Sequence, residues 1–375
     1  MRVDRDVELK WENMLAGIRA QPRWLRSGPA ALHEQARRIP GPAPARIYLV
    51  GCGDSHYCGL GTRLAFERWT GVPTEALESL EFSRYVAPHA PSDSLVVCVS
   101  NSGRVARTVE SAMIARERGM TAIALTFDAT SRLGTVCDHV LTFGYEDVGF
   151  GPGTLSYVTS LAGLYVIALR VAELRGRMTE AGVAGELAAL AGQADVLEAA
   201  IASGDPVAER LGSELDAGAR VHIIGGGPSQ GTALFGMAKL IEAAALPAVG
   251  QELEEWAHEQ YFCTGPGTLT VVVAPPGAAT DRAREQLAAV RDVGGTSAVV
   301  CHAGDAETAA MADAVLPIGE VPEELSPLAY CIPLELLAYH FATSKGAVML
   351  GFDDARRMEV NFRQIFGSRI AGAEA

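Results

Sequence analysis

The chain has 375 residues, of which 49% are hydrophobic and 20% charged, enough apolar surface for a large core; a mainly disordered chain is therefore excluded. The length predicts two domains or one large domain. The net charge is −14, and no Lys or Arg cluster stands out, which argues against nucleic acid or an anionic membrane surface as partner and favours a small molecule or a protein.

The N-terminal segment MRVDRDVELKWENML carries charges throughout and lacks the apolar core of a signal peptide. No apolar run of about 18 residues is free of charges and turn residues, so we expect no membrane span. The seven cysteines are scattered without a CxxC pair, which favours free thiols over disulfides or a zinc site. Together these features predict a cytoplasmic protein.

Apolar residues at helical spacing predict a helix over residues 5–26, followed by a connector rich in Pro, Gly and Ala. A short apolar strand at 47–50 then leads directly into Gly51-Cys52-Gly53-Asp54-Ser55. Beyond it, predicted helices and buried strands alternate; the helices are at 59–70, 105–118 and 154–175, and the strands at 95–99, 121–126 and 138–143. This alternation predicts an α/β fold whose parallel sheet has helices on both faces.

The sequence repeats itself at a constant offset. RIYLVGCG at 46–53 aligns with RVHIIGGG at 220–227, and SLVVCV at 94–99 aligns with TLTVVV at 268–273. Such a repeat indicates tandem duplication of one α/β unit, with the Ala- and Leu-rich stretch 180–203 as a helical bridge. We therefore expect two doubly wound parallel-sheet domains between a helical arm and a tail, with the arm at 1–45, the first domain and bridge at 46–203, the second domain at 204–350 and the tail at 351–375.

The strongest local signal is Ser100-Asn101-Ser102-Gly103, which directly follows the buried strand 95–99 and opens a helix. Two hydroxyls and free backbone N–H groups at a helix N-terminus are suited to hold an anion. Ser55 follows the first strand and is expected to complete this cradle, because the carboxyl ends of parallel strands meet at one edge of the sheet. The equivalent segment of the second copy, Ala274-Pro275-Pro276-Gly277, has no hydroxyls, so we expect only the first copy to bind an anion in this way.

This motif and several others resemble the tandem SIS (sugar isomerase) domain family, and they follow one another in the family's order over nearly the whole chain. The other motifs are GCGDS at 51–55, LEF at 80–82, GMAKLIE at 236–242, EWAH at 255–258 and PLELLAYH at 333–340. Within the family, the chain is most similar to the isomerase half of glucosamine-6-phosphate synthase and to the deglycases of fructosamine phosphates. The resemblance implies SIS-type domains, a sugar derivative as ligand, and a homodimer.

In that family, a Glu and a His of the second domain carry out the acid–base chemistry, and Glu242 and His258 match them in position and spacing. The resemblance implies that Glu242 abstracts the proton and that His258, contributed by the neighbouring subunit, acts as the acid or opens the ring. A carboxylate base and an imidazole suit this chemistry near neutral pH. Lys239 lies one helical turn before Glu242 and is either a third catalytic residue or a salt-bridge partner. Glu255, three residues before His258, is a candidate to orient it.

Two departures from the family pattern leave the substrate open. Asp54, Arg104 and Val105 stand where sugar-phosphate-binding relatives carry a small or hydroxyl residue, an acidic residue and a Thr, respectively. An Asp repels a phosphate dianion, so either Arg104 compensates or Asp54 accepts a hydrogen bond from the hydroxyl of an unphosphorylated sugar. The expected substrate-binding residues are Gly53, Asp54, Ser55, Ser100, Asn101, Ser102 and Arg104.

The C-terminal segment 352–358 lacks the ring-opening lysine of the synthase and resembles the deglycase tail. We therefore expect a deglycase that releases the amine from an open-chain fructosyl-amine (an Amadori compound), with or without a 6-phosphate. No metal or organic cofactor is expected, because the sequence has neither a metal-ligand cluster nor a complete dinucleotide fingerprint. Two alternatives remain open, namely an aldose–ketose isomerase of a sugar phosphate or amino-sugar phosphate, and a non-catalytic sugar sensor.

Overall fold

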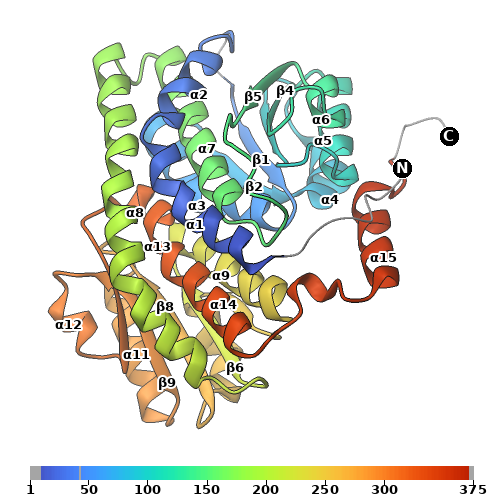
Figure 1. Ribbon diagram of the computed structural model, residues 1–375. Helices are drawn as coiled ribbons and strands as arrows, with labels where there is room; N and C mark the ends of the chain where they lie inside the picture. The colour runs from blue at the N-terminus through green and yellow to red at the C-terminus, as the bar shows by residue number, and fades with distance from the viewer. Residues whose placement is uncertain (1–9, 42–43, 371–375) are drawn as a thin grey trace.

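The computed structural model describes residues 10–41 and 44–370 (Figure 1). The N-terminal arm consists of helix α1 (Trp11–Leu25) and a second helix that the sequence did not predict, α2 (Gly28–Ala36). The beginning of the helix expected from residue 5 lies outside the described residues. Both helices turn an apolar side toward the interior, where Ile18, Leu25 and Leu32 are fully buried.

Ten strands form two parallel five-stranded sheets, ordered β2-β1-β3-β4-β5 and β10-β9-β8-β6-β7. Read from the opposite edge, the second sheet has the same order as the first, so the structure confirms the duplication. The sequence missed the edge strands β2 and β7. The first sheet comprises β1 (Ile47–Gly51), β2 (Thr74–Glu78), β3 (Leu95–Val99), β4 (Thr121–Thr126) and β5 (His139–Thr142), and the second comprises β6 (Arg220–Gly225), β7 (Val249–Glu252), β8 (Thr268–Ala274), β9 (Thr296–His302) and β10 (Ala314–Ile318).

Helices cover both faces of each sheet, as the nearly continuous apolar strands predict. The outer faces pack against α5 (Ala106–Glu117) in the first domain and α11 (Thr280–Asp292) in the second. The inner faces share one core that joins the two domains. The helices around this shared core include α3 (Asp54–Thr70), α7 (Leu155–Leu174), α9 (Pro228–Ala244) and α14 (Ile332–Ser344).

Two long helices hold the domains together. The bridge expected at 180–203 is the 35-residue helix α8 (Glu180–Glu214), which continues beyond the predicted end and runs alongside both domains (Figure 1). By length and composition alone helix α7 could cross a membrane, although it contains Gly163 and Arg170 and is therefore not an uninterrupted apolar run. However, 89% of its apolar window is buried inside the protein, where it packs between the first sheet and the arm.

Helices α3 and α9 meet at the domain boundary. Each begins after a glycine with φ 56°, a left-handed conformation that disfavours other residues, and both glycines were visible in the repeated motif (Gly53 and Gly227). The helices approach so closely that a Cβ on Gly231 would lie 2.4 Å from the backbone oxygen of Tyr57. This contact packs the first turn of α9 against the first turn of α3, and Lys239, further along α9, reaches Asp54 at the start of α3.

The C-terminal tail contains a helix that the sequence analysis did not identify. Helix α15 (Ala355–Phe366) follows a short turn at Met349–Gly351 and lies beside the first domain (Figure 1). None of its residues is fully buried. Just beyond it, Ile370 inserts into the outer core of the first domain, and the Arg107 guanidinium donates a hydrogen bond to the backbone oxygen of Arg369.

Candidate active site

Three charged side chains meet where α3 crosses α9. Lys239 is fully buried, and its Nζ donates a hydrogen bond to Oδ2 of Asp54 at 2.7 Å and another to Oε2 of Glu242. Asp54 belongs to the first turn of α3, whereas Lys239 and Glu242 lie one turn apart on α9. We call Asp54, Lys239 and Glu242 the interdomain triad.

Lys239 is held as a cation. Burial alone would lower its pKa, but the carboxylates of Asp54 and Glu242 outweigh that effect, and the pKa of Lys239 is raised. Its Nζ also lies 4.9 Å from the centre of the Phe235 ring, a further favourable contact for a cation. A lysine in this state does not act as a free amine, and the geometry therefore assigns it the salt-bridge role.

Glu242 has the environment of an acid–base group. Desolvation raises its pKa to about 7, against the opposing effects of Lys239 and of a hydrogen bond from the backbone N–H of Gly153. Its side chain is 32% exposed, so the carboxyl is also accessible. A carboxyl group that titrates near neutral pH can both accept and return a proton under physiological conditions.

The structure shows a contact of Asp54 that the sequence analysis did not predict. Its Oδ2 accepts a hydrogen bond from the buried ammonium of Lys239. The other oxygen, Oδ1, is buried without a hydrogen-bond partner among the described residues. Because the charge of Asp54 is compensated by Lys239, the electrostatic objection to a phosphorylated substrate loses most of its force.

The predicted anion cradle lies at the carboxyl end of β3. Ser100 is 2% exposed and its Oγ has no hydrogen-bond partner among the described residues. Ser102 Oγ accepts a hydrogen bond from the backbone N–H of Arg104 at 3.3 Å, and Asn101 Oδ1 accepts one from the Tyr145 hydroxyl at 2.7 Å. Ser55 is half-buried in the first turn of α3, on the neighbouring strand end. The loop therefore offers hydroxyls and a helix N-terminus, as predicted.

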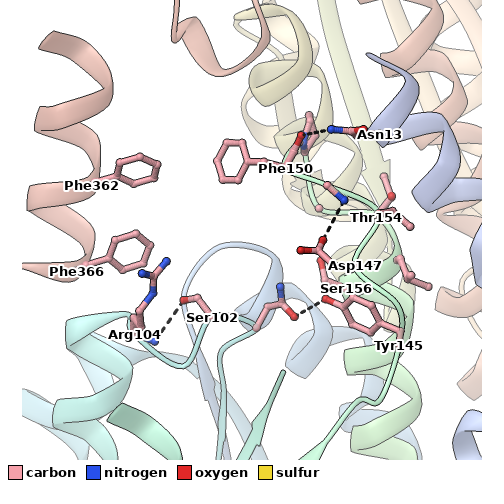
Figure 2. A pocket seen from close by; sticks show the side chains of 17 residues that line it. Asn13, Ser102, Arg104, Tyr145, Asp147, Phe150, Thr154, Ser156, Phe362 and Phe366 are labelled. Carbon is pink, nitrogen blue, oxygen red and sulfur yellow. Dashed lines mark hydrogen bonds between the residues drawn. The ribbon is translucent and has the colours of Figure 1, made fainter. Parts of the chain in front are cut away.

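A cavity of about 520 Å³ adjoins this loop, and Asn101, Ser102 and Arg104 are among its lining residues (Figure 2), whereas Asp54, Lys239 and Glu242 are not. One wall is the segment 147–156, which the sequence analysis missed although four glycines between 144 and 153 follow strand β5 at the same sheet edge. Gly153 connects the cavity to the triad, because it lines the cavity and its N–H contacts Glu242. A Cβ on Gly153 would lie 3.0 Å from Asp54 Oδ2. The opposite wall carries Phe362 and Phe366 of α15.

Arg104 lines the same cavity and makes no ion pair with any residue in the described part of the chain. Its guanidinium carbon lies 4.9 Å from the centre of the Phe366 ring. It is therefore a positive charge next to Ser102 that an anionic ligand can use.

His258 stands apart from the triad. It ends the short helix α10 (Leu253–His258), its side chain is 67% exposed, and its Nε2 lies 3.4 Å from Oε1 of Glu254. This contact corrects the expectation that Glu255 orients it, because Glu254 is four residues earlier and is itself fixed by Arg282. Trp256 on the same helix lies in the core of the second domain.

In the second copy, a side chain of the protein itself occupies the position equivalent to the cradle. The backbone N–H of Ala278 donates a hydrogen bond at 3.0 Å to Oε1 of Glu323. A Cβ on Gly277 would lie 2.3 Å from the same oxygen, so the carboxylate sits directly against the loop. In the part of the chain that the structure describes, no group of three or more His, Cys, Asp or Glu residues is placed to hold a metal ion.

The chain is similar to sugar-metabolism proteins in sequence and structure. Glutamine–fructose-6-phosphate aminotransferase (isomerizing) of Mycobacterium tuberculosis (strain ATCC 25618 / H37Rv) is 30% identical over 307 residues, which are 80% of this chain and 49% of that protein. The chain thus spans about half the length of the curated relatives it matches.

Solved structures share the fold. The C-terminal domain of glucosamine-fructose-6-phosphate aminotransferase from Francisella tularensis has a TM-score of 0.80 at 21% identity and covers 91% of this chain and 99% of that one. Tagatose-6-phosphate ketose/aldose isomerase from Escherichia coli has a TM-score of 0.75 at 17% identity over 98% and 97% of the two chains. The SIS domain model matches residues 43–170 and 215–345, and the protein is therefore a member of the SIS domain family with two tandem copies of the domain.

Proposed function

We propose that this protein catalyses proton transfer between C1 and C2 of an open-chain, phosphorylated sugar derivative, with Glu242 as the base. The observation that carries the proposal is the contact of Gly153 with Glu242, which links this carboxyl, whose pKa is raised to about 7, to the cavity beside the serine loop. The similar proteins are named for fructose 6-phosphate and tagatose 6-phosphate, which supports a sugar phosphate as substrate.

The polar groups of the cavity divide the work by position. The Ser100–Ser102 loop and Arg104 bind the phosphate at one end of the cavity. Because the protein has a net charge of −14, it needs a local positive charge to bind an anion, and Arg104 supplies it. At the other end, Glu242 lies behind Gly153 and removes the proton from the carbon next to the carbonyl. Lys239 and Asp54 act as positioning residues, since the buried ammonium fixes the Glu242 carboxylate and stabilises its charge.

Isomerisation also needs a second group that moves protons between the two oxygens. His258 is our candidate. Its side chain is 67% exposed and, among the residues that the structure describes, it contacts Glu254, so we propose that it enters the cavity of a second copy in a homodimer. Each site would then combine Glu242 of one subunit with His258 of the other. A mixture of Glu242→Gln and His258→Ala chains should recover activity if subunits exchange, whereas either variant alone should not.

A second candidate is the deglycase reaction, which uses the same proton transfer. Moving the C1 proton of a fructosyl-amine to C2 gives a C1 imine, to which water adds; the amine then leaves with a proton and an aldose remains. The size of the cavity favours this candidate, because about 520 Å³ leaves room for a substituent on the sugar. The sequence resemblance to the deglycase tail points in the same direction.

The test is deuterium exchange at C1 and C2, followed by NMR in D2O with fructose 6-phosphate, tagatose 6-phosphate and a fructosyl-amine 6-phosphate. Exchange by the wild-type protein that is lost in Glu242→Gln and retained in the surface control Glu214→Gln is the expected result. Release of free amine identifies the deglycase, and exchange without release identifies the isomerase. If the protein binds at least one of these compounds but catalyses proton exchange in none of them, catalysis is refuted and the sensor is favoured.

A further inference from the structure

A cluster of four phenylalanines lies at the cavity and is not used by the proposed chemistry; three of them line the cavity, and Phe352 packs against two of these three. Phe150 belongs to the segment 147–156, Phe352 precedes α15, and Phe362 and Phe366 lie on it. The ring centres of Phe150 and Phe352 are 6.4 Å apart, those of Phe150 and Phe362 6.3 Å, and those of Phe362 and Phe366 5.8 Å. We call these four residues the aromatic wall.

The aromatic wall is accessible from the cavity. Figure 2 shows Phe362 and Phe366 on one side of the space and Asp147 and Thr154 on the other. Helix α15 has no fully buried residue, and Phe150 is 38% exposed. The helix is nevertheless held in place by Ile370, which inserts into the core of the first domain. The wall is thus an apolar surface fixed beside a polar site rather than part of the protein core.

The aromatic wall lies close both to the segment that contacts Glu242 and to the serine loop. Phe150 lies three residues before Gly153, whose N–H contacts Glu242, whereas Phe366 lies against Arg104 beside the serine loop. The wall therefore extends from the segment that contains Gly153 to Arg104 beside the serine loop. In the proposed binding mode, a group attached to the reacting carbon lies nearest Phe150 and Phe362, because Gly153 links that side of the cavity to Glu242.

We propose that the aromatic wall is a specificity subsite for an apolar, preferably aromatic, group carried on the amine of a fructosyl-amine. This inference rests on the proposed function and names the substrate class that the same site prefers. An open-chain sugar phosphate exposes hydroxyls on nearly every carbon and does not need four phenyl rings. An aromatic substituent gains both apolar burial and edge or offset ring contacts with such a cluster.

The alternative occupant of the wall is a second copy of this chain, because α15 presents an apolar side that packs only partly against the rest of the subunit. The shared cavity favours the small molecule. Asn101, Ser102 and Arg104 line the same space as Phe362 and Phe366, so a ligand bound by the polar residues lies against the rings. A protein partner that covered the wall would also close the anion cradle.

The experiment compares two ligands that differ only in the side chain of the amine, the 6-phosphates of N-(1-deoxyfructosyl)-phenylalanine and N-(1-deoxyfructosyl)-glycine. Dissociation constants are measured by calorimetry on full-length Glu242→Gln, which is not expected to consume either compound. We expect the phenylalanine derivative to bind about tenfold more tightly. Adding Phe362→Ala should reduce this ratio to about twofold, and Phe362→Leu should leave an intermediate ratio. The matched control Gln364→Ala, on the exposed side of α15, should retain the full ratio.

Equal affinity for the two compounds, failure of both to bind, or an unchanged ratio in Phe362→Ala would each overturn the subsite. A loss of dimers or larger assemblies in Phe362→Ala, measured by light scattering, would overturn it in favour of the second copy. Proton exchange by the wild-type protein is scored separately. Exchange without side-chain preference refutes only the subsite, whereas selective binding without exchange refutes only the proposed chemistry.

Discussion

Replacing Asp54 by Asn tests whether the interdomain triad sets the proton affinity of Glu242. The substitution keeps the shape of the side chain but removes one of two negative charges that share the Lys239 ammonium. Two charges about 4 Å apart interact by ~4 kcal/mol at an effective dielectric constant of ~20. At 1.36 kcal/mol per pKa unit, that energy corresponds to an upper limit of about three units. Because the Glu242 side chain is 32% exposed, solvent screening reduces the effect, and we expect its pKa to fall by about one unit.

The sign of the effect on activity follows from the role of Glu242 as a base. Asp54 raises the pKa of Glu242, so its removal lets Glu242 ionise at lower pH. The acid limb of the pH–rate profile for proton exchange should then move down by the same amount. A direct readout is the carboxyl resonance of Glu242 in 13C-labelled protein, assigned by its absence in Glu242→Gln, with Asp216→Asn as a surface control. An unchanged or upward-shifted titration would refute the electrostatic coupling.

Three further substitutions probe the same region. Lys239→Met leaves two partly exposed carboxylates without their buried cation and should lower the free energy of unfolding by at most about 3–5 kcal/mol in denaturant titrations, because solvent screens both carboxylates. A loss below about 1 kcal/mol would contradict a stabilising salt bridge. Burial raises the pKa of Glu335 from 4.5 to about 8. Between these two pH values the folded protein keeps the proton on Glu335, whereas the unfolded chain has lost it. The free energy of unfolding therefore falls as the pH rises from 4.5 to about 8. Glu335→Gln should remove this part of the pH dependence while still pairing with Gln21, and identical slopes for both proteins would refute the assignment. Gly153→Ala places a methyl group about 3.0 Å from Asp54 Oδ2 and should lower the exchange rate at least about tenfold; full activity would show that the backbone at this point does not position Glu242.

Most of the fold could be predicted because the central strands are buried on both faces and therefore read as apolar runs. The edge strands β2 and β7 were not predicted, because their sequences TEALE and VGQE mix polar and apolar residues. An edge strand pairs with a neighbour on one side only and can therefore carry such a mixture. Helix α15 escaped because it contributes no buried residue. Its signal was nevertheless present in Met358, Phe362, Ile365 and Phe366, which recur at helical spacing after the N-capping residue Asp354.

The site residues likewise fall into two groups, those that a local sequence pattern identifies and those that only tertiary packing brings together. Glu242 was identified through the family resemblance, and Lys239 was identified because it lies one helical turn before Glu242. The link from Lys239 to Asp54 joins residues 185 positions apart and depends on the crossing of α3 and α9, which no local pattern records. The contact of His258 with Glu254 rather than Glu255 likewise depends on Arg282, whose position relative to α10 is set by tertiary packing.

Glu323 makes the two halves of this duplicated chain unequal. A carboxylate attached to the same polypeptide is present at the second loop at an effective concentration in the millimolar range or above, and a free anion must compete with it for the Ala278 N–H. In the folded chain the Glu323 carboxylate therefore occupies the second loop, while the first loop stays free to bind an anion. Each chain should take up one phosphate equivalent rather than two, and restoring serines to the second loop would not add a site unless Glu323 were also replaced.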